Sequence, residues 1–192
     1  MAAEHHVQTL TPGGRAVLDA ASRLFYERGI AAVGVDAVAA EAGVTKKTIY
    51  DRFRSKSALV RMYLAERDER YRRWVDAWIA EHPEADPALA VFDALESWRG
   101  SQGAKGCAFV HAHAELLAEP DHPAHEVIRA QKLWLHERFR VLVEEAGHAR
   151  AKELATELLA LHEGATVLYS LTETGDAVAA ARRAAQALLR TG

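Results

Sequence analysis

The residues that point most directly to a function are a cluster of cations and hydroxyls that follows Gly43. Residues 43–56 contain five Lys or Arg side chains and one acid, Asp51. Duplex DNA attracts such cations through its phosphates, and its major groove admits one α-helix whose N-terminal side chains reach the base edges. Two of the cations fall near the expected N-terminus of a helix, where the helix dipole disfavours them. This placement favours an anionic partner over the alternative, a solvated helix end.

The local sequence predicts a tight turn followed by a short helix that presents these side chains. Gly43 can adopt the left-handed conformation that closes a preceding helix, and Thr45 is a good N-cap for the next one. Val44 before the cap can pack on Ile49 as a hydrophobic staple. Ile49 and Phe53 are four residues apart and form the buried stripe of this helix, so the opposite side carries its charged residues.

Residues 11–56 resemble the N-terminal DNA-binding domain of the TetR family of bacterial one-component regulators. The motifs that carry the resemblance are, in order, Val38-Ala39, Ala42-Gly43-Val44-Thr45, Thr48-Ile49-Tyr50, Phe53 and Ser55-Lys56. The resemblance implies a three-helix domain on an all-helical ligand-binding and dimerisation body. It also implies repression that a small molecule relieves. Lys47 departs from the family, which often has glycine there, and this leaves the base contacts open.

The DNA contacts expected from the matching positions fall into two groups. Base or near-base contacts are expected from Lys46, Lys47 and Thr48, and phosphate contacts from Thr45, Tyr50 and Lys56. Asp51 can accept a hydrogen bond from a cytosine amino group, or it can pair with Lys47 or Arg54 and orient them. A homodimer would place two such helices about 34–36 Å apart, on a (pseudo)palindromic operator.

The pattern along the whole chain predicts an all-α protein of about nine helices. Helices are expected at about 11–28, 35–42, 45–53, 55–80, from 87 through 98, 107–118 and 121–147, with two more before the C-terminus. The helix at 107–118 is apolar around most of its circumference, so we expect it to be central and buried. The expected organisation is a disordered tail (1–10), a helix-turn-helix domain (11–56) and a ligand-binding and dimerisation domain (57–192).

Composition and charge agree with a cytoplasmic DNA-binding protein. The chain has 192 residues, of which 49% are hydrophobic and 27% charged, and its net charge is −3. Residues 11–56 contain 8 Lys/Arg and 5 Asp/Glu, so the first third of this mildly acidic chain is basic. The single cysteine excludes an internal disulfide. No apolar run reaches the roughly 20 residues that span a bilayer, and no signal peptide is visible, so no membrane partner is expected.

Aromatic side chains of the middle helices predict a ligand cavity, although an ordinary core would use the same residues. The candidates are Trp78, Phe92, Trp98, Phe109, His111, Trp134 and Phe139. They indicate a small aromatic or lipophilic ligand in a mostly apolar pocket. No cofactor is expected.

The last two helices carry stripes that predict a dimer interface. The stripes comprise Leu154, Leu158, Leu161, Ala165 and Leu168, and then Val178, Ala181, Ala185 and Leu188. Gly164 interrupts the first helix, where it would let another helix approach closely. The resemblance implies a four-helix bundle formed by two subunits. Packing within one subunit is the alternative.

The histidines suggest a second class of function. Cys107 and His111 are four apart on one helical face, and His122 and His125 form a second pair, so a metal-responsive regulator or a metal-dependent enzyme is an alternative. A metal site needs three or four converging ligands, and the sequence shows only pairs. A nonmetal enzyme is disfavoured by the lack of a phosphate loop or nucleophile elbow, so no catalytic residue is assigned.

Overall fold

The computed structural model describes residues 10–102, 105–172 and 174–191, and these residues form helices and no strand. The predicted tail, residues 1–10, lies outside this range except for Leu10, which is partly buried against the core. The helices are α1 (Pro12–Arg28), α2 (Val35–Glu41), α3 (Lys46–Phe53), α4 (Lys56–Glu81), α5 (Pro87–Ser101), α6 (Ala108–Glu115), α7 (Ala124–Glu145), α8 (Ala151–Thr172) and α9 (Ala177–Thr191). The predicted all-α fold is confirmed. No helix of the described chain is long and apolar enough to cross a bilayer.

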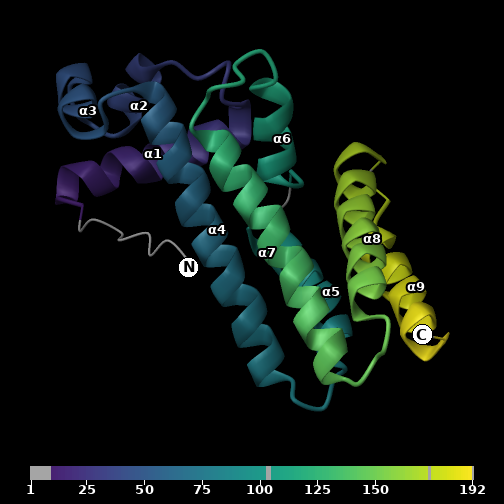
Figure 1. Cartoon of the computed structure of the whole chain (residues 1–192). Coiled ribbons are helices and arrows are strands. Elements are labelled where there is room, and N and C mark those ends of the chain that lie inside the picture. The colour runs from purple at the N-terminus through teal and green to yellow at the C-terminus, as the bar shows by residue number, and fades with distance from the viewer. Residues whose placement is uncertain (1–9, 103–104, 173, 192) are drawn as a thin grey trace.

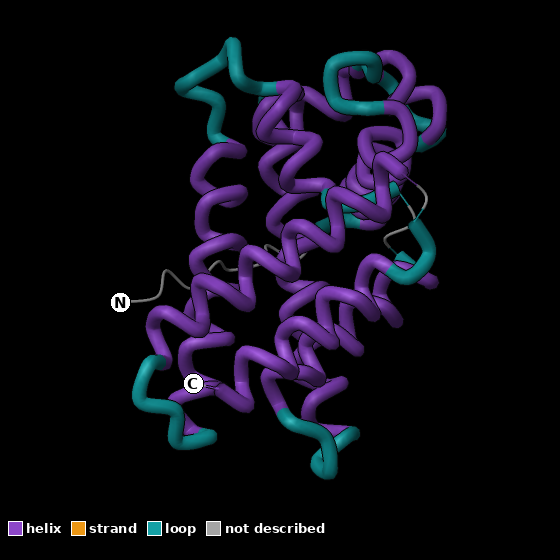
Figure 2. Tube along the Cα trace, turned by 90° about the vertical axis from the view of Figure 1, so that its right-hand side faces the viewer, coloured by secondary structure: helices purple, strands orange, loops and turns teal. Residues whose placement is uncertain are grey.

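The helices form two connected parts. The short helices α1–α3 gather at one end of α4, and α4 runs from them to the far end of the molecule beside α7 (Figure 1). Helices α8 and α9 pack against each other, and they contact α7 and α5, respectively. The tube in Figure 2 shows the same helices after a quarter turn, with the loops at the two ends of the long helices.

Two hydrophobic clusters divide the interior, and α4 belongs to both of them. The first cluster joins α1, α2 and α3 to Leu59, Val60 and Leu64 of α4, and it also includes α6 and the start of α7. The second cluster joins Tyr71 and Val75 of α4 to α5, α7, α8 and α9. The core that α1–α3 build therefore extends beyond residue 56, the domain boundary expected from the sequence.

Side-chain caps explain why several helices begin where the sequence predicts. The hydroxyl of Thr45 accepts a hydrogen bond from the Thr48 N–H at 3.2 Å, and that of Ser55 accepts one from the Ala58 N–H at 3.0 Å. Each cap satisfies a backbone donor that has no partner within its helix.

Helix α6 differs from its expected central position. Only Ala108, Phe109 and Ala112 are buried, whereas His111 and His113 are exposed. The helix is short, and only one of its faces packs on the first cluster. Its remaining apolar residues are mostly small, so they can stay exposed to solvent. The prediction of a buried central element at 107–118 is wrong.

A strained turn joins α3 to α4. Arg54 has φ 69° and ψ −43°, and the Ser55 N–H donates to the Phe53 carbonyl at 2.8 Å across it. A three-residue turn with positive φ at its centre is the rare and strained γ-turn. Arg54 is exposed, so packing of its side chain does not explain why an arginine occupies this strained position.

We expect Arg54→Gly to raise the free energy of unfolding by about 1 kcal/mol, because glycine adopts positive φ without steric cost. Urea denaturation measures the difference. The matched control is Arg52→Gly, an exposed helical position where glycine should cost up to about 1 kcal/mol. Equal destabilisation by both variants would show that the turn at Arg54 is not strained.

Candidate nucleic-acid interface and ligand cavity

The turn between α2 and α3 holds the two helices in a fixed relation. Gly43 has φ 65°, its N–H donates to the Ala40 carbonyl, and the Val44 N–H donates to the Ala39 carbonyl. These two bonds form a Schellman ending, which satisfies carbonyls that the end of α2 leaves free. Ile49 and Phe53 then fix α3 on the core, with exposed fractions of 0% and 3%.

The outer face of α3 carries charged and hydroxyl side chains. Lys46 donates to Asp36 at 3.0 Å and Lys47 to Asp51 at 2.7 Å, and both pairs are exposed. The carboxylates raise the pKa of both lysines, so both are cations at neutral pH. Tyr50 is 42% exposed. The pairing of Asp51 with Lys47 agrees with its expected orienting role.

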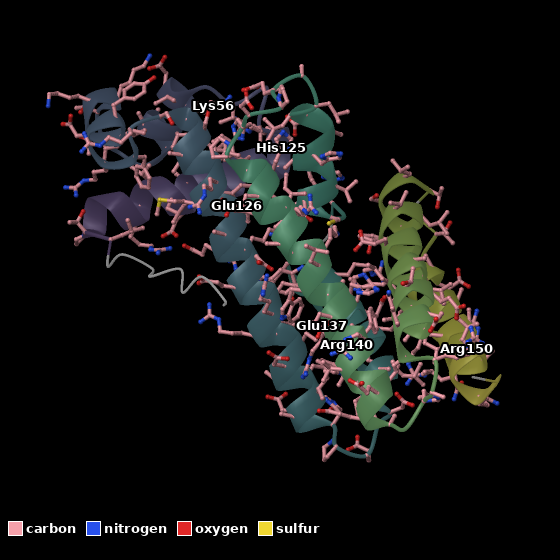
Figure 3. All side chains as sticks on the ribbon, viewed as in Figure 1. Lys56, His125, Glu126, Glu137, Arg140 and Arg150 are labelled. Atoms are coloured by element: carbon pink, nitrogen blue, oxygen red, sulfur yellow. The ribbon has the colours of Figure 1, made fainter. Side chains whose placement is uncertain are left out.

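Lys56 differs from the other predicted DNA contacts. Its ammonium donates to the Ile30 carbonyl at 2.6 Å, and its side chain is half-buried. Figure 3 shows Lys56 at the end of the molecule that carries α1–α3, in the region where α4 and α7 begin. Lys56 can bind a phosphate only by giving up or sharing this hydrogen bond.

A small cavity of about 50 Å³ lies between α4, α5, α7 and α8. Aromatic rings of Tyr71, Trp98 and Phe109 form part of its wall. Tyr71 and Trp98 meet edge to face with their ring centroids 5.3 Å apart. Gly106 closes one side, with φ 92° and no room for a side chain, because an added Cβ would lie 2.6 Å from the Ser170 Cβ.

A half-buried ion pair forms the polar part of this cavity. Lys132 donates to Glu163 at 2.7 Å, and it also lies 3.4 Å from the Cys107 sulfur. Burial alone would raise the pKa of Glu163, but His162 and Lys132 lower it to about 2. Burial alone would lower the pKa of Lys132, but Cys107 and Glu163 raise it. The two groups therefore stay charged at neutral pH.

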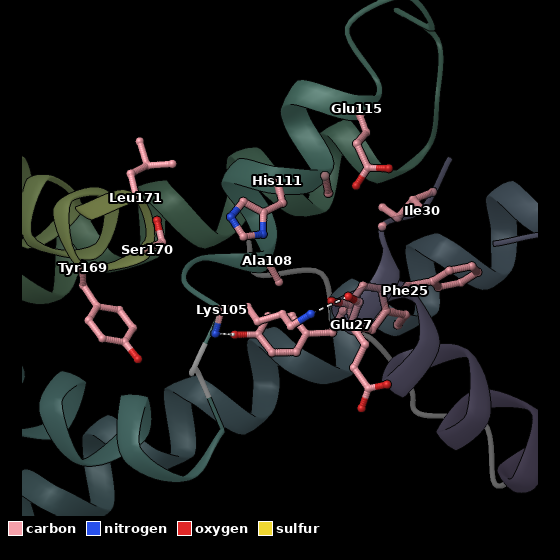
Figure 4. Close-up of a pocket in the computed structure, with 14 residues that line it drawn as sticks. Phe25, Glu27, Ile30, Lys105, Ala108, His111, Glu115, Tyr169, Ser170 and Leu171 are labelled. Atoms are coloured by element: carbon pink, nitrogen blue, oxygen red, sulfur yellow. Dashed lines mark hydrogen bonds between the residues drawn. The ribbon is translucent and has the colours of Figure 1, made fainter. Parts of the chain in front are cut away.

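A larger open groove of about 620 Å³ adjoins the end of α1 (Figure 4). His111 and Glu115 of α6 lie on one side of it, and Tyr169 of α8 lines both the groove and the small cavity. Lys105 spans the groove to α1, because its ammonium donates to the Glu27 carbonyl at 2.6 Å and its backbone N–H to the Tyr26 hydroxyl at 2.9 Å. The groove therefore lies between the end of α1 and α8.

Comparisons with known proteins agree with this architecture. The family model described as bacterial regulatory proteins, tetR family, matches residues 17–62. A TetR-family transcriptional regulator from Streptomyces coelicolor is 30% identical, with 94% of this chain and 95% of that chain covered and a TM-score of 0.86. The chain belongs to the TetR family. It is a transcriptional regulator with an N-terminal DNA-binding domain, in a family whose members are not enzymes.

Two further relatives support the TetR assignment. A putative TetR-type regulator from Streptomyces avermitilis is 28% identical, covers 92% of this chain and 99% of that chain, and has a TM-score of 0.68. An uncharacterized helix-turn-helix-type regulator from Mycobacterium tuberculosis is 36% identical over 75 residues. That match covers 39% of this chain and 37% of the mycobacterial protein, so it spans little more than a third of each.

The predicted ligand residues of this TetR-family chain do not form one site. Trp98 and Phe109 line the small cavity, whereas His111 lines the open groove. Phe92 and Phe139 pack on each other in the second core cluster. Trp78 stacks on His82, and Trp134 lies under the Arg72 guanidinium, both half-buried. Placing Trp78, Phe92, Trp134 and Phe139 around one ligand with Trp98 is therefore wrong.

Sequence reasoning missed the polar residues of the cavity. They are Arg67, Gln131, Lys132, His162 and Glu163. A signal was present, because Arg67 lies four residues after Tyr63 and four before Tyr71, on the face of α4 that both tyrosines bury. His162 likewise lies between Leu158 and Ala165 on the buried face of α8.

The predicted dimer stripes lie mostly inside the subunit. Leu154, Leu158, Ala165, Val178, Ala181 and Ala185 are all less than 9% exposed in the single chain. A side chain already covered by its own subunit offers no area to a second copy, so their assignment to the dimer surface is wrong. Of the other predicted positions, Leu168 is exposed, and Leu161 and Leu188 are half-buried.

The two candidate metal pairs do not converge. Cys107 faces Lys132, whereas His111 lines the groove on the other side of α6. The His122 and His125 rings lie 6.4 Å apart, and the His125 Nε2 lies 3.0 Å from the Glu119 carbonyl oxygen. Within the described ranges, no three His, Cys, Asp or Glu side chains form a group that could hold a metal ion.

The half-buried pair predicts a pH-dependent effect on stability. Glu163→Gln leaves Lys132 half-buried without a carboxylate, so the free energy of unfolding should fall by about 2 kcal/mol at pH 7. The pKa of Glu163 is about 2 in the folded chain and 4.5 for an unperturbed carboxyl, so its contribution is fully present above pH 4.5 and is lost as pH falls toward 2.

Urea denaturation of both proteins between pH 7 and pH 3 measures this difference. The control is Glu137→Gln, which removes an exposed partner of Arg140 and should change stability little. A Glu163→Gln variant as stable as the original at pH 7 would contradict the prediction.

Proposed function

We propose that this TetR-family regulator is a one-component repressor, which binds a (pseudo)palindromic operator as a homodimer and is released by a small aromatic or lipophilic ligand. The observation that carries the proposal is the outer face of α3, where Lys46, Lys47 and Tyr50 are exposed, while Ile49 and Phe53 hold the opposite face in the core. The placement of the N-terminal residues of α3 on the surface suits entry into a major groove. The family resemblance supports repression and release by a ligand. The two-fold symmetry of such operators supports a dimer.

The six expected DNA contacts now fall into three groups. Lys46, Lys47 and Thr48 supply base or near-base contacts, and Thr45 and Tyr50 contact phosphates. Thr48 is preorganised, because its hydroxyl lies 2.9 Å from that of Thr45. Lys56 forms a third group, because it donates a hydrogen bond to the Ile30 carbonyl and contacts a phosphate only by giving up or sharing that bond.

The experiment that tests the proposal measures binding to the DNA upstream of the chain's own gene by fluorescence anisotropy. Salt is varied from about 50 to 200 mM, with scrambled duplex as competitor. Tight binding that resists the competitor supports the proposal. If no duplex binds even at low salt, including those from a random-sequence selection, the proposal is wrong.

In this assay Lys47→Ala should weaken specific binding by about 1–3 kcal/mol and change the sequence preference, because Lys47 stands near the base edges. The matched control is Lys152→Ala, which removes an exposed cation of α8 far from α3 along the chain and should leave affinity unchanged. Equal affinity of the original protein and Lys47→Ala for every duplex would contradict the assigned role.

The outer face of α8 supports the dimer. Val167, Leu168 and Leu171 are exposed apolar side chains of α8, at 38%, 52% and 77%. Gly164, one turn earlier, is also exposed, and an added Cβ there would meet no atom within 4 Å. The single subunit therefore gives no packing reason for this glycine, whereas the close approach of a partner helix does.

We expect Leu168→Glu to convert the dimer into a monomer, because a charge would be buried at the centre of the interface. Analytical ultracentrifugation measures the change. Leu117→Glu replaces a similarly exposed leucine just after α6 and should remain dimeric. If Leu168→Glu stays dimeric at micromolar concentration, the subunits associate through another surface.

A further inference from the structure

The guanidinium of Arg67 is a buried cation without an anionic partner. Arg67 is 6% exposed, and it lines the cavity between α4, α5, α7 and α8. The guanidinium donates a hydrogen bond to the Gln102 carbonyl at 2.8 Å. No carboxylate among the described residues forms an ion pair with it, although burial of an uncompensated charge is costly.

Two aromatic rings hold the guanidinium in place but do not neutralise it. Its Cζ lies 4.1 Å from the centroid of the Tyr26 ring and 5.5 Å from that of the Trp98 ring. Burial raises the pKa of the Tyr26 phenol, although Arg67 lowers it in turn, so this ring is neutral at physiological pH. Cation–π contacts recover only part of the hydration that burial removes.

The other charges around the cavity cancel in pairs. Arg99 pairs with Glu96, and Lys132 pairs with Glu163. Arg67 therefore leaves one positive charge beside a cavity whose wall is otherwise rich in aromatic rings. This combination fits a ligand with one negative charge and an apolar, aromatic body.

A second unsatisfied group faces the same cavity. Gln131 is 3% exposed, and its Oε1 has no hydrogen-bond partner among the described residues. Buried amide oxygens are normally paired, because an unpaired one loses its hydration without compensation. A hydroxyl or amino group of a ligand would donate to this oxygen.

We propose that the effector of this regulator is an aromatic monocarboxylate, whose carboxylate binds Arg67 and whose ring lies against Trp98 and Phe109. The inference rests on the proposed function, because it names the ligand class of a ligand-released repressor. A carboxylate is preferred to a phosphate since one charge is to be balanced and the guanidinium fork matches two carboxylate oxygens. A ring hydroxyl or amine that reaches Gln131 adds affinity.

Arg67 also connects the ligand to the DNA-binding end. Tyr26, which contacts Arg67, lies in the last turns of α1, and its hydroxyl donates to the Gly106 carbonyl at 3.1 Å. The cavity of about 50 Å³ is smaller than a benzene-sized cavity of about 150 Å³, so a ring must displace the wall. A carboxylate that draws Arg67 from Tyr26 weakens a contact between α1 and α4.

The test compares charged and neutral ligands of the same shape. The panel is benzoate, 4-hydroxybenzoate, phenylacetate, cinnamate and 2-naphthoate, each with its amide, measured by calorimetry on the full chain without DNA at pH 7.5. At least one carboxylate should bind more than tenfold tighter than its amide, because a hydrogen-bonded ion pair replaces a neutral contact. If no carboxylate in the panel is preferred over its amide, the proposal is wrong.

The variant Arg67→Gln identifies the group responsible for the preference. It should weaken binding of that carboxylate more than tenfold and leave binding of the amide unchanged. Arg73→Gln, an exposed arginine on the same helix, should change neither. An equal loss for carboxylate and amide would show that Arg67 only supports the fold, and would overturn the proposal.

DNA binding completes the test. Because Arg67→Gln removes the contact with Tyr26 that the carboxylate is expected to weaken, it should lower the affinity for operator DNA without ligand, and the carboxylate should lower that affinity no further. Carboxylate preference without binding to any DNA would mean that the repressor function fails and the ligand site stands. DNA binding without carboxylate preference would mean that the proposed ligand site is wrong and the repressor function stands.

Discussion

The structure depends on one constraint, which is that a single helix belongs to both hydrophobic cores. The N-terminal half of α4 buries Leu59 and Leu64 with α1–α3, and its C-terminal half buries Tyr71 and Val75 with the other helices. A helix transmits displacement along its axis because its backbone hydrogen bonds resist bending. A change at the cavity is therefore either absorbed at the side chains that contact α4 or shifts the end that carries α3.

Polar contacts supplement α4 at the junction of the two parts. The Glu115 carboxylate of α6 accepts from the Ala31 N–H at 2.6 Å, beyond the end of α1, and Lys105 and Lys56 donate to carbonyls at Glu27 and Ile30. Exposed hydrogen bonds contribute little net free energy, since water can replace them. Such a junction can be rearranged at lower cost than an apolar core, which has few alternative packings. The arrangement thus combines a stiff helix with a replaceable set of polar contacts.

The sequence predicted the DNA-binding end well because its signals are local. A glycine at the helix ending, a Thr45 cap and the Ile49–Phe53 spacing act within a few residues, and the structure confirms each of them. The assignment of the apolar stripes to a dimer interface was wrong for a physical reason. A run such as Leu154, Leu158 and Ala165 shows that a helix face is buried, but the same spacing results from burial against another helix of its own subunit. The cavity was harder still, because residues 66–73 are mostly charged, and the position of Arg67 between Tyr63 and Tyr71 is a weak signal of burial.

The energy that a ligand must supply explains why the contact with Arg67 is suited to a switch. Moving a two-state equilibrium from about 99:1 to 1:99 needs a difference in binding free energy of about 5.5 kcal/mol between the states. A hydrogen bond to a charged group contributes about 1.5–3 kcal/mol, and a symmetric dimer has two sites, so two such contacts supply about 3–6 kcal/mol. This energy shifts the equilibrium only if the contact differs between the two states. A guanidinium fixed equally in both would bind a ligand tightly and regulate nothing. In the proposed mechanism Arg67 meets the condition, because the Tyr26 ring that it contacts belongs to the DNA-binding end and the cavity that it lines belongs to the body.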